Sequence, residues 1–100
     1  MLKHIVLFKL KQHAEGATKE ANAKKIKADL EALKGKISQI KHLEVGINCI
    51  PGESAYDIAI YSEFAGEADL NSYLKHPEHV KVAEFIGKIR ESRVAVDYLV

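Results

Sequence analysis

The chain has 100 residues, of which 47% are hydrophobic and 29% charged, with 15 Lys and Arg against 14 Asp and Glu. This length suits one modest core, so we expect residues 1–100 to form a single domain without a separate cofactor domain. The net charge of +1 argues against nucleic acid or an anionic membrane as a partner, because phosphate binding needs clustered positive charge. The single cysteine, Cys49, excludes an internal disulfide and a thiolate metal cluster.

The apolar run at residues 5–8 is flanked by Lys3 and Lys9, and no small-residue cleavage site follows it. It is too short and too charged to be a signal peptide or a membrane span, and no other segment reaches about 18 apolar residues. We therefore expect a cytoplasmic protein in a reducing compartment. Cys49 has no basic neighbour in sequence and is predicted to be a small core residue.

Residues 2–10 are predicted to form a strand that is apolar on both faces. One alternating set contains His4, Val6, Phe8 and Leu10, and the other contains Ile5 and Leu7. Residues 17–34 then show helical spacing, with a stripe formed by Ala23, Ile26, Leu30 and Leu33. A strand that is apolar on both faces must be covered twice.

The second half of the chain contains two more alternating runs, at residues 41–49 and 55–64, separated by a turn cluster at 51–54. A short helix is expected at 67–75, a longer one from Pro77 to about Ile89, and a last strand at 92–99. The order strand, helix, strand, strand, two helices, strand is the ferredoxin-like βαββααβ pattern. We expect an α+β fold with a four-stranded antiparallel sheet and helices on one face.

The other face of this sheet is predicted to be apolar as well, because Ile5, Leu7, Ala59 and Tyr61 fall on it. An exposed apolar sheet usually marks an interaction site, and face-to-face pairing in a symmetric homodimer would cover it. The alternative is that these apolar residues are incidental to two strands.

His76-Pro77-Glu78-His79 is the most informative stretch for chemistry. Pro77 and Glu78 suit the first turn of a helix, and His79 lies near the positive end of the helix dipole. This position favours a neutral imidazole, which can act as a general base. His79 also shares a helical stripe with Ala83 and Ile86, so it is expected to face the sheet.

His4, Tyr73 and His79 are predicted to meet at one cavity between sheet and helices. His79 would act as base and Tyr73 as an orienting donor, in proton-transfer chemistry on a carbonyl compound. The same groups can also bind a polar ligand without reaction, or His79 can simply belong to the helix start. The expected lining is His4, Val6, Phe8, Ile26, Leu30, Tyr73 and His79.

The sequence allows more than one role for two acidic residues and for one pair of histidines. Asp57 and Asp97 are either charges on the sheet surface or polar links within a dimer. His76 and His79 could supply two metal ligands at most, so we expect no metal and no cofactor.

Several segments together resemble the stress-responsive dimeric α/β-barrel (Dabb) family, nearly end to end. They are Met1 to Lys9, Tyr56-Asp57, Ser62-Glu63-Phe64, Tyr73 to Val80 and Ser92 to Tyr98. The resemblance implies a ferredoxin-like subunit and a dimer whose two sheets form a barrel. Some members are stress-associated proteins, which implies a non-catalytic stress-response or structural oligomer as one possible role.

The chain is also distantly similar to olivetolic acid cyclase, a plant member of the family that closes a polyketide ring by aldol condensation. The similarity lies at His4, Tyr73 and His79. It implies a small carbonyl or polyketide-like ligand and, for an enzyme, cyclase- or lyase-like chemistry. The stretch that follows the first strand differs, because Ala21, Ala23, Ile26 and Leu30 stand where the cyclase has aromatic residues.

Overall fold

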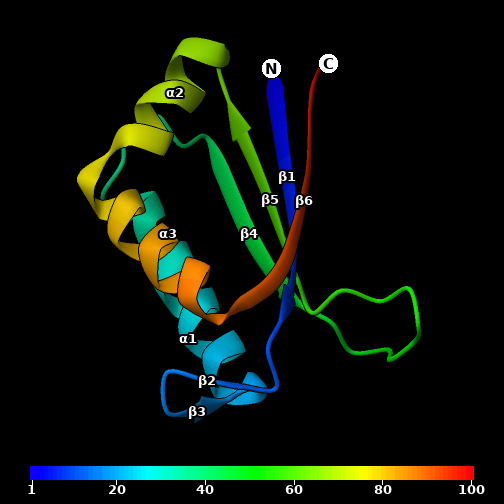
Figure 1. Ribbon diagram of the computed structural model, residues 1–100. Coiled ribbons are helices and arrows are strands. Elements are labelled where there is room, and N and C mark those ends of the chain that lie inside the picture. Colours follow the sequence, from blue (N-terminus) through cyan, green and yellow to red (C-terminus); the bar gives the residue numbers. More distant parts are fainter.

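One antiparallel sheet of four strands carries helices on a single face (Figure 1). The computed structural model describes residues 1–100. In chain order the elements are β1 (Leu2–Leu10), β2 (His13–Ala14), β3 (Ala17–Thr18), α1 (Lys19–Ala32), the 3-10 turn η1 (Leu33–Gly35), β4 (His42–Ile47), β5 (Ile58–Phe64), α2 (Glu67–Lys75), α3 (Pro77–Ile89) and β6 (Arg90–Leu99). The sheet order is β4-β5-β1-β6, and the predicted ferredoxin-like α+β fold is confirmed. No helix is both long enough and apolar enough to cross a membrane.

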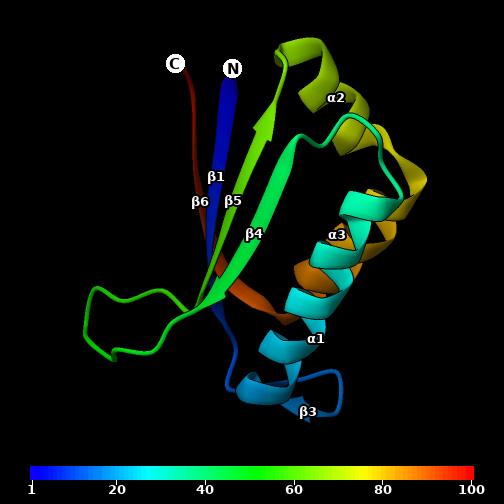
Figure 2. The same cartoon turned by 180° about the vertical axis from the view of Figure 1, so that it is seen from behind.

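The central strand β1 shows the predicted alternation without interruption. Every second side chain from Leu2 to Leu10, His4 included, is buried under the helices, and those between are half-buried on the other face. The covered face packs against α1, α2 and α3, and the hydrophobic core lies in this layer (Figure 2). The first face of the sheet is therefore closed by the chain itself.

The opposite face of the sheet has no helix over it and is apolar at its centre. Ile5 lies between Tyr61 of β5 and Val96 of β6, and Leu7 lies between Ala59 and Val94. Val94, Val96 and Tyr98 keep 45%, 53% and 43% of their surface exposed. The predicted second apolar face is confirmed, and we call it the open face.

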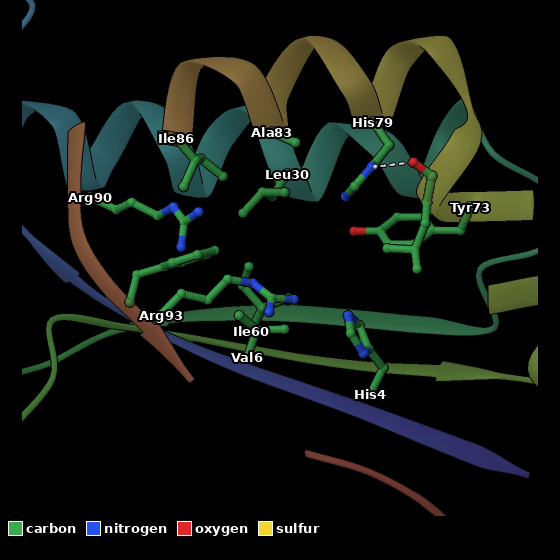
Figure 3. A pocket seen from close by; sticks show the side chains of 12 residues that line it. His4, Val6, Leu30, Ile60, Tyr73, His79, Ala83, Ile86, Arg90 and Arg93 are labelled. Carbon is green, nitrogen blue, oxygen red and sulfur yellow. Dashed lines mark hydrogen bonds between the residues drawn. The ribbon is translucent and has the colours of Figure 1, made fainter. Parts of the chain in front are cut away.

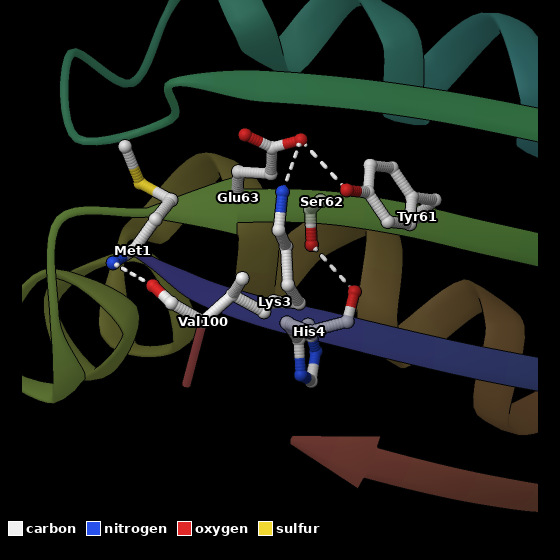
Figure 4. A network of polar contacts seen from close by, with 7 residues as sticks. All are labelled: Met1, Lys3, His4, Tyr61, Ser62, Glu63 and Val100. Carbon is white, nitrogen blue, oxygen red and sulfur yellow. Dashed lines mark hydrogen bonds and ion pairs between the residues drawn. The ribbon is translucent and has the colours of Figure 1, made fainter. Parts of the chain in front are cut away.

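Polar contacts border the open face near the two chain ends (Figure 4). The Lys3 ammonium pairs with the Glu63 carboxylate at 2.9 Å, and the Tyr61 hydroxyl donates to the same carboxylate at 2.7 Å. The hydrogen bond from Tyr61, followed by that from Lys3, lowers the pKa of Glu63 below its usual value. The backbone N–H of Val100 donates to the carbonyl of Met1 at 3.0 Å, so the ends lie side by side.

Two local expectations from the sequence pattern are wrong. One strand ends earlier than expected, and one helix begins later. β4 ends at Ile47, so residues 48–57 form a loop that projects beyond the sheet (Figures 1 and 2). Cys49 lies in this loop and is exposed, so it is not a core residue. The helix predicted from residue 17 starts at Lys19, after the small β2–β3 hairpin, where the Thr18 side chain accepts the Ala21 N–H at 3.2 Å.

Candidate ligand-binding site

A cavity of about 190 Å³ lies between the covered face of the sheet and the helices (Figure 3). Eight of its twelve lining residues are hydrophobic. The lining consists of His4, Val6, Phe8, Leu30, Ile60, Tyr73, Leu74, His79, Ala83, Ile86, Arg90 and Arg93. Six of the seven predicted lining residues are present. The exception is Ile26, which lies one turn before Leu30 on α1 and is completely buried in the core.

His79 lies on the first turn of α3, which begins at Pro77 as predicted. Its Nδ1 is 3.1 Å from the carbonyl oxygen of Leu74. A carbonyl only accepts hydrogen bonds, so Nδ1 carries the proton and Nε2 of the neutral ring keeps its lone pair. Figure 3 shows the second ring nitrogen directed into the cavity.

The protonation of His79 is set mainly by its surroundings in the folded chain. Burial lowers the pKa of His79 below its ordinary value of 6.5, and the positive charges of nearby groups act in the same direction. The hydrogen bond to Leu74 acts against this shift. The sequence predicted a neutral imidazole because of the helix dipole. In the folded chain, burial is the main cause of the lowered pKa of His79.

Tyr73 reaches the same cavity from α2. Its side chain is 2% exposed, and its ring centroid lies 4.4 Å from that of His79 and 5.0 Å from that of Phe64. The hydroxyl points into the cavity, forms no hydrogen bond with the other residues that line it, and stays accessible from it (Figure 3). Burial raises the pKa of Tyr73 to about 12, so the phenol stays protonated at neutral pH and can donate a hydrogen bond.

His4 forms the sheet side of the site. It lies opposite Asp97 of β6, and its Nδ1 is hydrogen-bonded to Oδ1 of that aspartate. The fully buried Ser62 donates from Oγ to the His4 carbonyl at 3.1 Å (Figure 4). The His4 ring is therefore held by Asp97 of β6, and the His4 backbone by Ser62 of β5.

The two aspartates that the sequence left open both form links within one chain. Asp97 is the partner of His4. Asp57 accepts the backbone N–H of Leu10 at 2.7 Å and pairs with the Lys19 ammonium at 3.3 Å. These carboxylates fix the positions of β1, α1 and β6 relative to one another.

Arg90 and Arg93 also line the cavity, although the sequence pattern does not predict it. They are three residues apart, so strict alternation along a strand would place them on opposite faces. The register between β1 and β6 shifts at Lys9/Leu10, which sets Arg93 opposite Phe8 and Arg90 opposite Leu10. Because Phe8 and Leu10 both face the helices, the two guanidinium groups reach the same side.

His76 is not part of the cavity lining. Its Nδ1 accepts the backbone N–H of Glu78 at 3.1 Å and thereby caps α3. No group of three His, Cys, Asp or Glu side chains comes close enough together to hold a metal ion.

A four-stranded antiparallel sheet with helices on one face and a largely apolar cavity beneath them defines a ferredoxin-like α+β protein with a candidate ligand site. The family model described as Stress responsive A/B Barrel Domain (Dabb) matches residues 2–100. The chain belongs to this family.

Two curated relatives, both described as stress-response A/B barrel domain-containing proteins, come from Arabidopsis thaliana. The chain is 30% identical over 104 residues to the one named DABB1, covering 99% of this chain and 47% of that protein. It is 31% identical over 103 residues to the second, covering 99% of this chain and 36% of that protein. The chain therefore spans less than half the length of these relatives.

Two solved structures have the same fold. One, from Bacteroides fragilis, is described as a dimeric protein of unknown function and ferredoxin-like fold; it has a TM-score of 0.86 and 42% identity, covering 99% of this chain and 95% of that one. The other is the hydroxynitrile lyase of Passiflora edulis, with a TM-score of 0.79 and 22% identity, covering 99% and 92%. The similarity to olivetolic acid cyclase stays a prediction.

Proposed function

We propose that the cavity binds a small carbonyl compound and that His79 takes a proton from the carbon next to the carbonyl. The observation that carries this proposal is the pair formed by Tyr73 and His79. Their rings lie 4.4 Å apart, and a free hydroxyl and a free ring nitrogen face one cavity. A protonated phenol and a neutral imidazole are the donor and the base that such a step needs.

The proton transfer balances with these two side chains alone. Nε2 of His79 accepts the proton from the carbon, and the C–H electron pair forms a carbon–carbon double bond. The carbonyl electron pair moves onto oxygen, where the Tyr73 hydroxyl donates a hydrogen bond to the developing negative charge. The resulting enolate can regain a proton, attack an electrophilic carbon as in a cyclase, or expel a leaving group as in a lyase.

The size of the cavity limits the ligand. A cavity of about 150 Å³ is enough for one benzene molecule, and drug-sized pockets start at about 300 Å³. A volume of about 190 Å³ therefore suits a compound of one ring or a short chain. A longer, polyketide-like chain would have to extend out of the cavity mouth.

Exchange of α-protons into D₂O tests this proposal without knowledge of the product. Cyclopentanone is incubated with the protein near pH 7, and loss of its α-proton NMR signal is followed. We expect catalysed exchange in the native chain, a loss of about 100-fold in His79→Gln and a smaller loss in Tyr73→Phe. His13→Gln, on the exposed β2, is the matched control and should change nothing.

Two results would contradict the proposed chemistry. One is an exchange rate no faster than that of buffer at every protein concentration. The other is catalysed exchange that is unchanged in both His79→Gln and Tyr73→Phe, because the base would then lie elsewhere.

We also infer that a second copy of the chain covers the open face. The support is the apolar row around Ile5 and Leu7, together with the dimeric state described for the Bacteroides fragilis protein. This observation favours a second candidate function, a non-catalytic stress-response or structural oligomer whose sheet-to-sheet contact is its main feature. Catalysed α-proton exchange is expected for the carbonyl-binding enzyme and not for the non-catalytic oligomer, so this measurement distinguishes the two functions.

A cytoplasmic location and the absence of nucleic-acid partners belong to the same proposal. The exposed Cys49 is the only cysteine of the chain, which suits a reducing compartment. The balanced charge of +1 offers no basic surplus for a polyanion.

A further inference from the structure

The chain uses its two kinds of basic side chain in different places. It has thirteen lysines but only two arginines, Arg90 and Arg93, and no lysine lines the cavity whereas both arginines do. Figure 3 shows the two guanidinium groups entering from the side opposite Tyr73 and His79. Arginine differs from lysine in its rigid planar fork, which binds a carboxylate through two parallel hydrogen bonds.

Neither arginine has an acidic partner within the chain. The seven ion pairs of the structure all involve lysines or His4, and no Asp or Glu is among the twelve lining residues. Of the two carboxylates on β6, Asp97 is bonded to His4, and Glu91 does not line the cavity. The half-buried Arg90 and the exposed Arg93 thus line a largely apolar cavity that contains no carboxylate of the chain.

A backbone irregularity is responsible for this pairing. Without the register shift between Lys9 and Leu10, Arg90 and Arg93 would project from opposite faces of β6. Such irregularities often redirect side chains next to functional sites. The shift costs regular pairing at one position of the sheet and brings a second guanidinium to the cavity.

We propose that the compound held in this cavity is a small organic acid whose carboxylate is bound by Arg90 and Arg93. Its apolar body would lie along Leu30 and Ala83, which line the cavity between the arginines and the aromatic pair. Its carbonyl would lie at Tyr73 and His79, and this last point rests on the proposed function. The preferred ligand class is therefore a short keto acid, which the two arginines bind more tightly than a neutral ketone.

A matched pair of probes, 4-oxopentanoate and its neutral analogue 4-oxopentanamide, tests the assignment by calorimetric titration. Loss of two charge-assisted hydrogen bonds should weaken binding of the amide by about tenfold or more. Arg90→Gln and Arg93→Gln should each weaken binding of the acid by a similar factor and leave the amide unaffected. Lys34→Gln, a cation outside the cavity, is the control and should change neither affinity.

Arg93→Lys keeps the charge but not the planar fork, so it should retain only part of the affinity for the acid. Unchanged binding of the amide shows that each variant is folded with its cavity intact. Should Arg93→Gln fail to fold, Arg93→Lys and Arg90→Gln still report on the carboxylate.

The outcomes separate this inference from the proposed function. Equal affinity for acid and amide overturns the role of the arginines and leaves the carbonyl site standing. Tight, arginine-dependent binding of the acid without α-proton exchange overturns the base chemistry and leaves the carboxylate site standing. Absence of binding by both probes overturns both.

Discussion

Both faces of the sheet are apolar at their centre, but their environments differ. On the covered face, α1, α2 and α3 bury Val6 and Phe8 and leave a cavity with polar groups converging on it. On the open face, Ile5 and Leu7 lie in a row with no layer above them. Alternation of apolar residues thus predicts that a face will be covered, but it does not predict whether the cover comes from the chain or from a partner.

The polar residues of the two faces also differ in burial and position. The covered face carries His4 and Ser62, which are buried and hydrogen-bonded at fixed positions. The open face has its polar residues at the border, where Lys3 and Glu63 form an ion pair that solvent reaches. Buried, fixed polar groups suit ligand recognition, whereas an apolar centre with a polar rim suits a protein–protein contact.

The largest expected effect concerns the covered face. Phe64 is completely buried between the rings of Tyr73 and His4. Phe64→Ala should lower the free energy of unfolding by about 3–5 kcal/mol, because it removes a buried ring and leaves a cavity. Denaturant unfolding measures this change.

The control for this substitution is Ile50→Ala, in the loop between β4 and β5, where the side chain is 74% exposed. Its effect should stay within about 0.5 kcal/mol. Similar losses for both variants would contradict the view that the core of this chain lies only on the covered face.

The second effect concerns the open face and tests whether a second copy covers it. Leu7→Asp places a charge at the centre of the apolar row, where a partner sheet would have to bury it. We expect the native chain to sediment with the mass of a dimer at micromolar concentration. The variant should do so only at concentrations about 100-fold higher, if at all.

Glu44→Asp, an exposed acidic position on β4, serves as a mild control and should leave the mass unchanged. A monomeric mass for the native chain would show that the open face is uncovered in solution. The apolar row around Ile5 and Leu7 would then be exposed to solvent and would not mark a contact between two copies.

The smallest effect is the pH dependence that His79 adds on the covered face. Its folded-state pKa lies below 6.5, so the unfolded chain binds the proton first as the pH falls. The stabilising contribution is therefore fully present above pH 6.5, decreases as the pH drops below this value and levels off below the folded-state pKa.

Unfolding midpoints measured in urea between about pH 5 and pH 8 check this dependence. His79→Gln should flatten the slope below pH 6.5, and His13→Gln should leave it in place. An unchanged slope in His79→Gln would mean that another group titrates in this range.

Much of the fold and part of the site follow from the sequence. The period of two along residues 2–10 determines that His4 shares a face with Val6 and Phe8. The helical spacing of His79, Ala83 and Ile86 determines that the imidazole faces the sheet. In a ferredoxin-like order these two faces must meet, which is why the convergence of His4, Tyr73 and His79 could be expected.

The tertiary structure decided the remaining points, and each depends on where an element starts, ends or slips. Cys49 is exposed because β4 ends two residues before it, and Ile26 is excluded from the cavity although it shares a helical stripe with Leu30. Arg90 and Arg93 share a face only because the register shifts between β1 and β6. Sequence periodicity determines which side of an element is buried, whereas pairing between distant strands determines which side chains meet, and that pairing exists only in the folded chain.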